Sequence, residues 1–127
     1  MKPELDAALC AKYPEIFAGR NASLTTTAMC WGFEVGDGWY SLIDVLCEEL
    51  QRETAQQGAP QVIATQVKEK YGGLRFYVHA VSERQMAMID FAEALSYRIC
   101  EECGAPGMLD ERAGKWMTTR CQQHKFA

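Results

Sequence analysis

Long apolar runs are absent from this 127-residue chain. No stretch of about eighteen consecutive apolar residues occurs, as a membrane-spanning helix would need. The segment from Met1 to Asp6 lacks the apolar stretch of a signal peptide, so we expect a cytoplasmic protein with no membrane partner. The hydrophobic content of 48% is enough for a folded core, which excludes a disordered tail and favours one compact domain.

Positive charge is also in short supply. The 13 Lys and Arg side chains are outnumbered by 17 Asp and Glu side chains, which gives a net charge of −4. Nucleic-acid-binding domains are typically basic, so this balance argues against that class as the first choice. The acids are concentrated between Glu34 and Glu53, where six of them accompany one arginine.

Histidine is rare, and one of the two histidines closes a motif of four potential metal ligands. Cys100 and Cys103 are spaced as C-x2-C, and after seventeen further residues Cys121 and His124 are spaced as C-x2-H. This spacing is typical of a tetrahedral Cys3His zinc site, and such donors suit Zn²⁺ better than Mg²⁺ or Ca²⁺. Four protein ligands leave no position for water, so the expected ion is structural.

The other three cysteines lack the paired spacing of metal ligands. Cys10, Cys30 and Cys47 are far apart in the sequence, and cytoplasmic thiols stay reduced. We expect single buried thiols at these positions.

The pattern of apolar residues predicts an α+β fold in which helices pack on a β-hairpin or small antiparallel sheet. Residues 4–17 predict a helix that Pro14 interrupts. A second helix is expected from Trp39, with Asp37 as its N-cap and a stop between Gln56 and Pro60. Its core-facing stripe is Trp39, Leu42, Ile43, Leu46 and Leu50.

The second half of the chain predicts a hairpin, a third helix and the zinc module. Strands are expected over 62–67 and 74–79, with a turn at Gly72 and Gly73. Ser82 and Gln85 form a capping box, after which one helix face carries Met88, Phe91, Ala92, Leu95 and Ile99. Residues 1–99 are therefore expected to form the α+β body, and residues 100–127 a zinc ribbon, resembling a treble clef, with a hairpin over 108–117.

Two surfaces are candidates for a protein partner. The loop from Trp31 to Trp39 holds tryptophans between glycines, the kind of rigid apolar area found in binding hot spots, although both tryptophans fit a core role as well. The second helix carries an acidic face that is expected to be exposed, and which is as compatible with a solvated surface. The predicted partner-binding residues are Phe33, Glu34, Asp37, Asp44, Glu48, Glu49 and Glu53.

The alternative is nucleic-acid binding through the predicted hairpin. Lys68, Lys70, Arg75 and Tyr77 mix cations with an aromatic ring, which could contact a phosphate backbone and stack on bases. Three cations predict only weak, salt-sensitive binding. A solvated sheet face is the simpler interpretation of this pattern.

Catalysis is the third class, and the sequence offers no catalytic residues for it. Nucleases of the HNH type use a treble clef but need a base histidine on its hairpin, which the segment 108–117 lacks. His79, at the end of a predicted strand, is the only histidine outside the metal motif. Glu34 and Asp37 have no accompanying nucleophile. We therefore predict a protein that is not an enzyme.

Three segments carry a family resemblance: CWGFEVGDGWYSLID (residues 30–44), QVKEKYGGLRFYV (residues 66–78) and SYRICEECGAPG (residues 96–107). They resemble an uncharacterised family of small accessory proteins encoded in bacteriophage and prophage genomes. The resemblance implies a protein that acts in the cytoplasm of an infected bacterium. By analogy with other small acidic phage proteins, it would bind, and inhibit, a host macromolecule such as a defence-system component. The resemblance assigns no catalytic residues.

Overall fold

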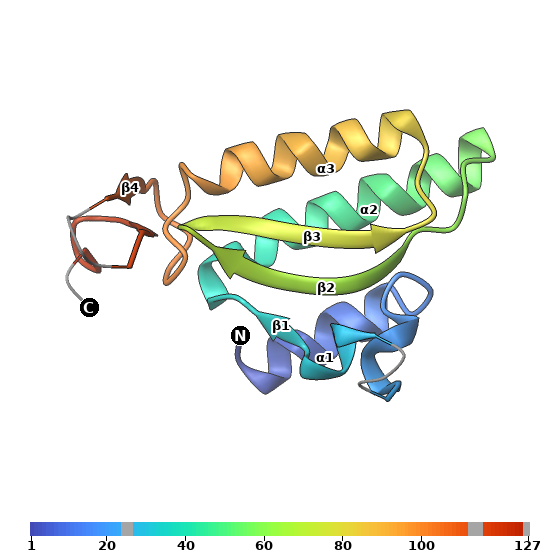
Figure 1. Ribbon diagram of the computed structural model, residues 1–127, viewed down its shortest axis with the longest axis horizontal. Helices are drawn as coiled ribbons and strands as arrows, with labels where there is room; N and C mark the ends of the chain where they lie inside the picture. Colours follow the sequence, from blue (N-terminus) through green and yellow to red (C-terminus); the bar gives the residue numbers. More distant parts are fainter. Residues whose placement is uncertain (24–26, 112–115, 126–127) are drawn as a thin grey trace.

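The computed structural model describes residues 1–23, 27–111 and 116–125, and these form an α+β fold. A hairpin-based sheet lies beside two long helices, and a small two-stranded sheet sits at one end of the molecule (Figure 1). The elements are, in order, α1 (Pro3–Lys12), η1 (Ala18–Asn21), η2 (Ala28–Trp31), β1 (Phe33–Glu34), η3 (Asp37–Trp39), α2 (Tyr40–Gln57), β2 (Ile63–Lys70), β3 (Gly73–His79), α3 (Glu83–Ser96), β4 (Met108–Asp110) and β5 (Thr118–Arg120).

The main sheet has the order β1-β2-β3 and is built on the predicted hairpin. Strands β2 and β3 are antiparallel, and the turn between them consists of Tyr71 and Gly72, both with positive φ, at 53° and 84°. Two left-handed residues are what a two-residue hairpin turn requires, so the turn lies one residue earlier than expected. Strand β1 pairs parallel with β2, which makes the sheet mixed; a two-residue strand carries no periodicity from which it could have been predicted.

One face of the sheet forms the core, and the other faces solvent. Phe33, Val67 and Phe76 lie next to one another across the three strands, and all are buried. Because side chains alternate along a strand, the following row, Glu34, Lys68 and Arg75, belongs to the opposite face. Helices α2 and α3 lie side by side behind the hairpin, and α1 lies near β1 (Figure 1).

Helix α2 follows the predicted stripe, but its start differs. Trp39, Ile43, Leu46 and Leu50 are buried as expected. The 3-10 turn η3 precedes the helix, and the Asp37 carboxylate accepts a hydrogen bond from the Lys2 backbone N–H (2.8 Å) instead of capping α2. The helix ends at Gln57, and the capping residue Gly58 has a φ of 69°, the left-handed conformation that favours glycine.

Helix α3 begins with the predicted capping box of Ser82 and Gln85, but its buried face differs from the one predicted. Its buried residues are Gln85, Ile89, Ala92 and Ser96. Two of these are polar because they satisfy buried backbone groups: Gln85 Nε2 donates to Leu50 O (3.2 Å), and Ser96 Oγ accepts from Leu74 N (2.9 Å).

Because α3 packs on this partly polar face, some of its apolar side chains lie outside the core. Phe91 is 71% exposed and Leu95 is 38% exposed, although both belong to the apolar face that the sequence predicts for this helix. Apolar periodicity failed here because hydrogen-bonding demands in the core, rather than hydrophobicity alone, select the face of the helix that packs inward.

Candidate metal centre

The four predicted ligands come together at one end of the molecule. Their donor atoms, three Sγ atoms and His124 Nδ1, all lie within 4.8 Å of one another. The Sγ atoms of Cys103 and Cys121 are 3.7 Å apart, and His124 Nδ1 is 3.7 Å from Cys100 Sγ and 3.2 Å from Cys121 Sγ. A tetrahedron of thiolates with metal–sulfur bonds of about 2.3 Å has edges of about 3.8 Å. The cluster is therefore the right size to hold a tetrahedral metal ion.

A tight knuckle positions the first ligand pair. The N–H of Gly104 donates to Cys100 O (2.9 Å), and the N–H of Cys100 donates to Ala105 O (2.7 Å). Gly104 has a φ of 82°, which an L side chain rarely adopts. Helix α3 ends at Ser96, so the helix delivers the chain to this knuckle within one turn.

A short hairpin positions the second pair. Strands β4 and β5 are antiparallel, and Cys121 directly follows β5. The N–H of Glu101 donates to Thr119 O (3.0 Å), which fixes the knuckle to this hairpin, and the N–H of His124 donates to Cys121 O (3.1 Å). The hairpin was predicted over 108–117; its second strand lies later, at Thr118–Arg120, and residues 112–115 lie outside the described residues.

The crowded donors favour a bound cation. Partial burial raises the pKa of the Cys121 thiol, but hydrogen bonds with His124, Cys100 and Cys103 outweigh it and lower that pKa to about 6. The N–H of Ala105 lowers the pKa of Cys103, yet the neighbouring sulfurs of Cys100 and Cys121 raise it overall. Several thiolates this close repel one another unless a metal ion lies between them.

The C-terminal segment that carries the four candidate ligands, here called the metal-binding module, is hydrogen-bonded through residues 99–101 to the loop that precedes α2. The N–H of Gly38 donates to Glu101 O (2.7 Å), the N–H of Gly36 donates to the Glu101 carboxylate (2.9 Å), and Trp39 Nε1 donates to Ile99 O (2.9 Å). A Cβ atom on Gly36 would lie 2.3 Å from Glu101 O, and one on Gly38 would lie 2.1 Å from Cys100 O. These glycines are required for close backbone approach, which explains why the loop is glycine-rich.

A second contact joins the module to the β2–β3 turn. The Thr119 hydroxyl donates to Gly72 O (2.6 Å), and Leu109 lies against Gly72. The module thus contacts the loop and the 3-10 turn just before α2 and the tip of the hairpin, and it follows the end of α3 in the chain.

Several predicted partner-binding residues are not available at the surface. Phe33 is 5% exposed and packs edge-to-face on Phe17 with ring centroids 4.8 Å apart. Glu53 is 7% exposed and forms an ion pair with Arg84 (2.6 Å). The expectation that Glu53 is exposed is wrong, because Arg84 of α3 lies against it. Phe33 was predicted as a partner contact with a core role equally open, and β1 turns it into the core.

The remaining predicted acidic residues differ in their exposure and in the ion pairs and hydrogen bonds they form. Glu34 and Glu48 are exposed, and Glu49 is half-buried beside Arg52. Asp37 is engaged by Lys2. Asp44 accepts hydrogen bonds from the Tyr13 hydroxyl (2.5 Å) and Lys12 Nζ (2.9 Å).

The residues of the alternative nucleic-acid site share one sheet face. Lys68 pairs with Arg75 across β2 and β3, Tyr77 pairs with Gln66 on the same face, and Lys70 pairs with Gly73. Tyr77 is 41% exposed and Lys70 is also exposed, while Arg75 donates to the Tyr97 hydroxyl (3.1 Å). The sheet register gathers these side chains, but Glu34 shares the face.

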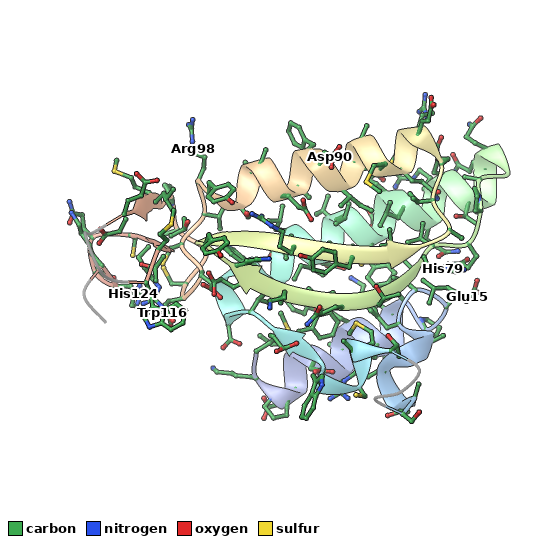
Figure 2. All side chains as sticks on the ribbon, viewed as in Figure 1. Glu15, His79, Asp90, Arg98, Trp116 and His124 are labelled. Atoms are coloured by element: carbon green, nitrogen blue, oxygen red, sulfur yellow. The ribbon has the colours of Figure 1, made fainter. Side chains whose placement is uncertain are left out.

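The other cysteines and His79 contribute no ligands to the cluster. All six cysteines are free thiols; Cys47 is buried as expected, whereas Cys10 and Cys30 are only half-buried. His79 ends β3, and Figure 2 places it at the opposite end of the molecule from His124. Among the residues that the structure describes, Cys, His and acidic side chains form one group of metal-binding size.

Sequence reasoning missed an apolar groove between α2 and α3. It has a volume of about 540 Å³ and is lined mainly by apolar side chains, including Val45, Met88, Phe91 and Leu95. The sequence signal for this groove was Val45, an apolar residue of the second helix that the predicted core stripe does not include. Its side chain is 59% exposed.

Comparisons with family models, curated proteins and solved structures give no match. None of the described helices has the length and apolar character that crossing a membrane requires. The Cys3His cluster, which has the size of a metal site, is therefore the main indication of what this chain does.

Proposed function

We propose that the metal is Zn²⁺ and that its role is structural. The observation that carries this proposal is the set of four donors within 4.8 Å of one another. Four donors complete the coordination shell of a tetrahedral ion and leave no position for a substrate or water. Three thiol sulfurs and one imidazole nitrogen match zinc rather than a hard cation. The contacts with Gly36, Gly38 and Gly72 support a role in joining segments far apart in the sequence.

Elemental analysis of the purified chain tests this assignment. We expect one zinc ion per chain, released by a strong chelator together with a loss of helical circular dichroism, because metal binding and folding are linked. A chain that contains well under one equivalent of zinc yet keeps its full melting temperature would contradict the proposal.

We further propose that the chain acts by binding a protein and not as an enzyme. Support comes from the α2–α3 layer, which leaves large apolar side chains such as Phe91 exposed within an acidic surface. The resemblance to phage accessory proteins adds the expectation of a host protein as the partner, with a defence-system component as the target and inhibition as the effect. On this proposal the chain functions in the bacterial cytoplasm.

Capture from a bacterial host tests this proposal. The tagged full-length chain should retain one protein at a reproducible stoichiometry, identified by mass spectrometry. The purified partner should then bind the purified chain directly, and its own activity should fall when the chain is added. Absence of any partner that binds directly would refute the protein-binding proposal, whereas direct binding without inhibition would refute only the inhibitory role.

A second candidate is nucleic-acid binding by the open sheet face. The specific observation in its favour is that Lys68 and Arg75 lie opposite each other with Tyr77 on the same face. A titration of labelled single-stranded DNA at about physiological ionic strength tests it. Submicromolar affinity that is lost in Arg75→Glu would replace the protein-binding proposal; weak binding that disappears with modest added salt would exclude the candidate.

A further inference from the structure

The groove between α2 and α3 exposes a contiguous group of large apolar side chains to solvent. Phe91 and Val45 are 71% and 59% exposed, and Leu95 is 38% exposed. Leu42, Leu46 and Met88 lie deeper in the same groove. Scattered apolar side chains are common on protein surfaces, but a contiguous group within a groove marks a binding site.

The groove is held open by the interactions that orient α3. Gln85 donates to Leu50 O and to Thr54 Oγ1, and Ser96 is bound to Leu74 N. These contacts lie at both ends of α3, so the helix cannot rotate to bury Phe91 without breaking hydrogen bonds in the core. The apolar surface is therefore a built feature of the fold.

The charge around the groove indicates the character of its occupant. Glu49 and Arg84 are the charged side chains of the groove lining. Helices α2 and α3 together carry seven acids and two arginines, a net charge of −5, against −4 for the entire chain. Of these acids, Asp44 and Glu93 lie outside the lining, where Lys12 and the N–H of Phe76 hold them. Both arginines are engaged with acids, Arg52 with Glu48 and Glu49, and Arg84 with Glu53. Asp90 is exposed on α3 (Figure 2). An acidic surface of this kind attracts a basic partner and repels a second copy of itself.

The length of the groove sets the size of that occupant. Its lining extends along α3 from Arg84 to Leu95, about 16 Å at 1.5 Å per residue, which corresponds to about three turns of a bound helix. Two antiparallel helices offer a channel in which a third helix can lay an apolar stripe.

We propose that the α2–α3 groove binds a helical segment of the protein partner, with apolar side chains at i, i+4 and i+7 facing Phe91 and Val45 and with Lys or Arg on its flanks. This inference rests on the proposed protein-binding function and specifies its site. Binding buries the exposed apolar groups, and the flanking cations lie against the acids of α2 and α3.

A model peptide tests the chemistry of the groove without knowledge of the partner. The probe is a fluorescein-labelled helical peptide of about three to four turns with Leu at i, i+4 and i+7 and Lys elsewhere. Its fluorescence anisotropy is followed with the zinc-loaded full-length chain. We expect Phe91→Asp to weaken binding at least about tenfold. Asp90→Lys should weaken it a few-fold, with an effect that shrinks as salt is added.

Met86→Asp is the matched control, because Met86 is a partly exposed apolar residue of α3 outside the groove lining. Helical circular dichroism and zinc content should be unchanged in all three variants. A peptide with Glu in place of Lys should bind much more weakly. Equal binding of the Lys and Glu peptides, or equal binding by Phe91→Asp and Met86→Asp, would overturn the inference.

Capture experiments with the same variants separate the inference from the function on which it rests. Loss of the partner in Phe91→Asp but not in Met86→Asp supports the groove. Retention of a directly bound partner by Phe91→Asp overturns the groove and leaves protein binding intact, whereas no partner for the unaltered chain overturns both. Sedimentation that reveals a dimer abolished by Phe91→Asp would show that a second copy occupies the groove, which also overturns the inference.

Discussion

The outer surface of the α2–α3 layer and the open face of the sheet differ in almost every chemical respect. The helical layer is acidic and presents Phe91, Val45 and Leu95 in a groove. The sheet face presents Lys68, Lys70, Arg75 and Tyr77, with Glu34 as its acid on β1. The modest net charge of the chain conceals this contrast, because a two-layer fold with one core leaves both outer surfaces available. The two surfaces offer different partners different chemistry, and the predictions below test what maintains each of them.

Loss of the proposed zinc ion should have the largest effect, because it disturbs both surfaces together. Cys121→Ser removes one of the four ligands, and the module they form contacts the 3-10 turn just before α2 and the tip of the β2–β3 hairpin. We expect loss of zinc, a lower melting temperature and loss of peptide binding by the groove. Elemental analysis and circular dichroism measure the first two.

Cys30→Ser is the control for that substitution, because Cys30 is a free thiol outside the cluster. It should keep zinc and the melting temperature of the unaltered chain. Retention of stoichiometric zinc by Cys121→Ser would show that the cluster is not the metal site.

A pair of substitutions on α3 tests which residues belong to the core and which to the groove. Ile89 is 2% exposed, so Ile89→Ala should lower the free energy of unfolding by about 2–4 kcal/mol through lost burial and the cavity left behind. Phe91→Ala should change it by less than about 0.5 kcal/mol, since the ring is exposed. Urea denaturation measures both. The reverse order would mean that α3 packs with the face expected from its apolar periodicity.

Gly38→Ala should have an intermediate effect on the junction between the metal module and α2. Its Cβ atom would lie 2.1 Å from Cys100 O, so the knuckle must move and the bond from Gly38 N to Glu101 O must weaken. We expect a loss of about 1–3 kcal/mol in stability and faster zinc release to a chelator.

Gly58→Ala is the comparison for this substitution, because a Cβ atom there meets nothing within 4 Å. Its cost should be about 1 kcal/mol for the left-handed backbone, with zinc release unchanged. If both variants release zinc at the same rate, the glycine contacts do not support the metal site.

Asp44→Asn should have the smallest effect, and one that depends on pH. Partial burial raises the pKa of Asp44, but the Tyr13 hydroxyl and the Lys12 ammonium lower it by more, so it lies below its usual range. The stabilisation is therefore present above the ordinary carboxyl pKa of about 3.9 and is lost as pH falls through the folded-state value. At neutral pH the variant should be about 1 kcal/mol less stable, and the difference should close below about pH 4. A difference that stays constant between neutral and acidic pH would contradict this account.

The local elements of the fold could be predicted from the sequence. The four ligands occur as two pairs at the spacing of a knuckle and a turn, the capping box lies within four consecutive residues, and Gly58 ends α2 where a helix stop was expected. Each of these depends on interactions between near neighbours in the chain, which the sequence displays directly.

The role of the Trp31–Trp39 loop could not be predicted in the same way. Glycines beside tryptophans are compatible with a binding loop and with a core plug, and nothing in that segment reveals a backbone from residues 99–101 lying against it. The structure shows that Gly36 and Gly38 admit Glu101 and Cys100, and that Trp39 is buried and bound to Ile99 O. Trp31, by contrast, is 63% exposed.

The candidate metal ligands, the helix boundaries near Ser82 and Gly58, and the acidic excess of the α2 segment can be predicted from the chain alone, because spacing, caps and charge are local properties. The burial of Phe33 and Glu53, the shared face of Lys68 and Arg75 and the exposure of Phe91 depend instead on how distant segments pack. Packing is not read from apolar periodicity because the core must also satisfy backbone groups such as Leu50 O and Leu74 N. The polar residues that do so, Gln85 and Ser96, turn α3 inward on a face that its apolar pattern does not reveal.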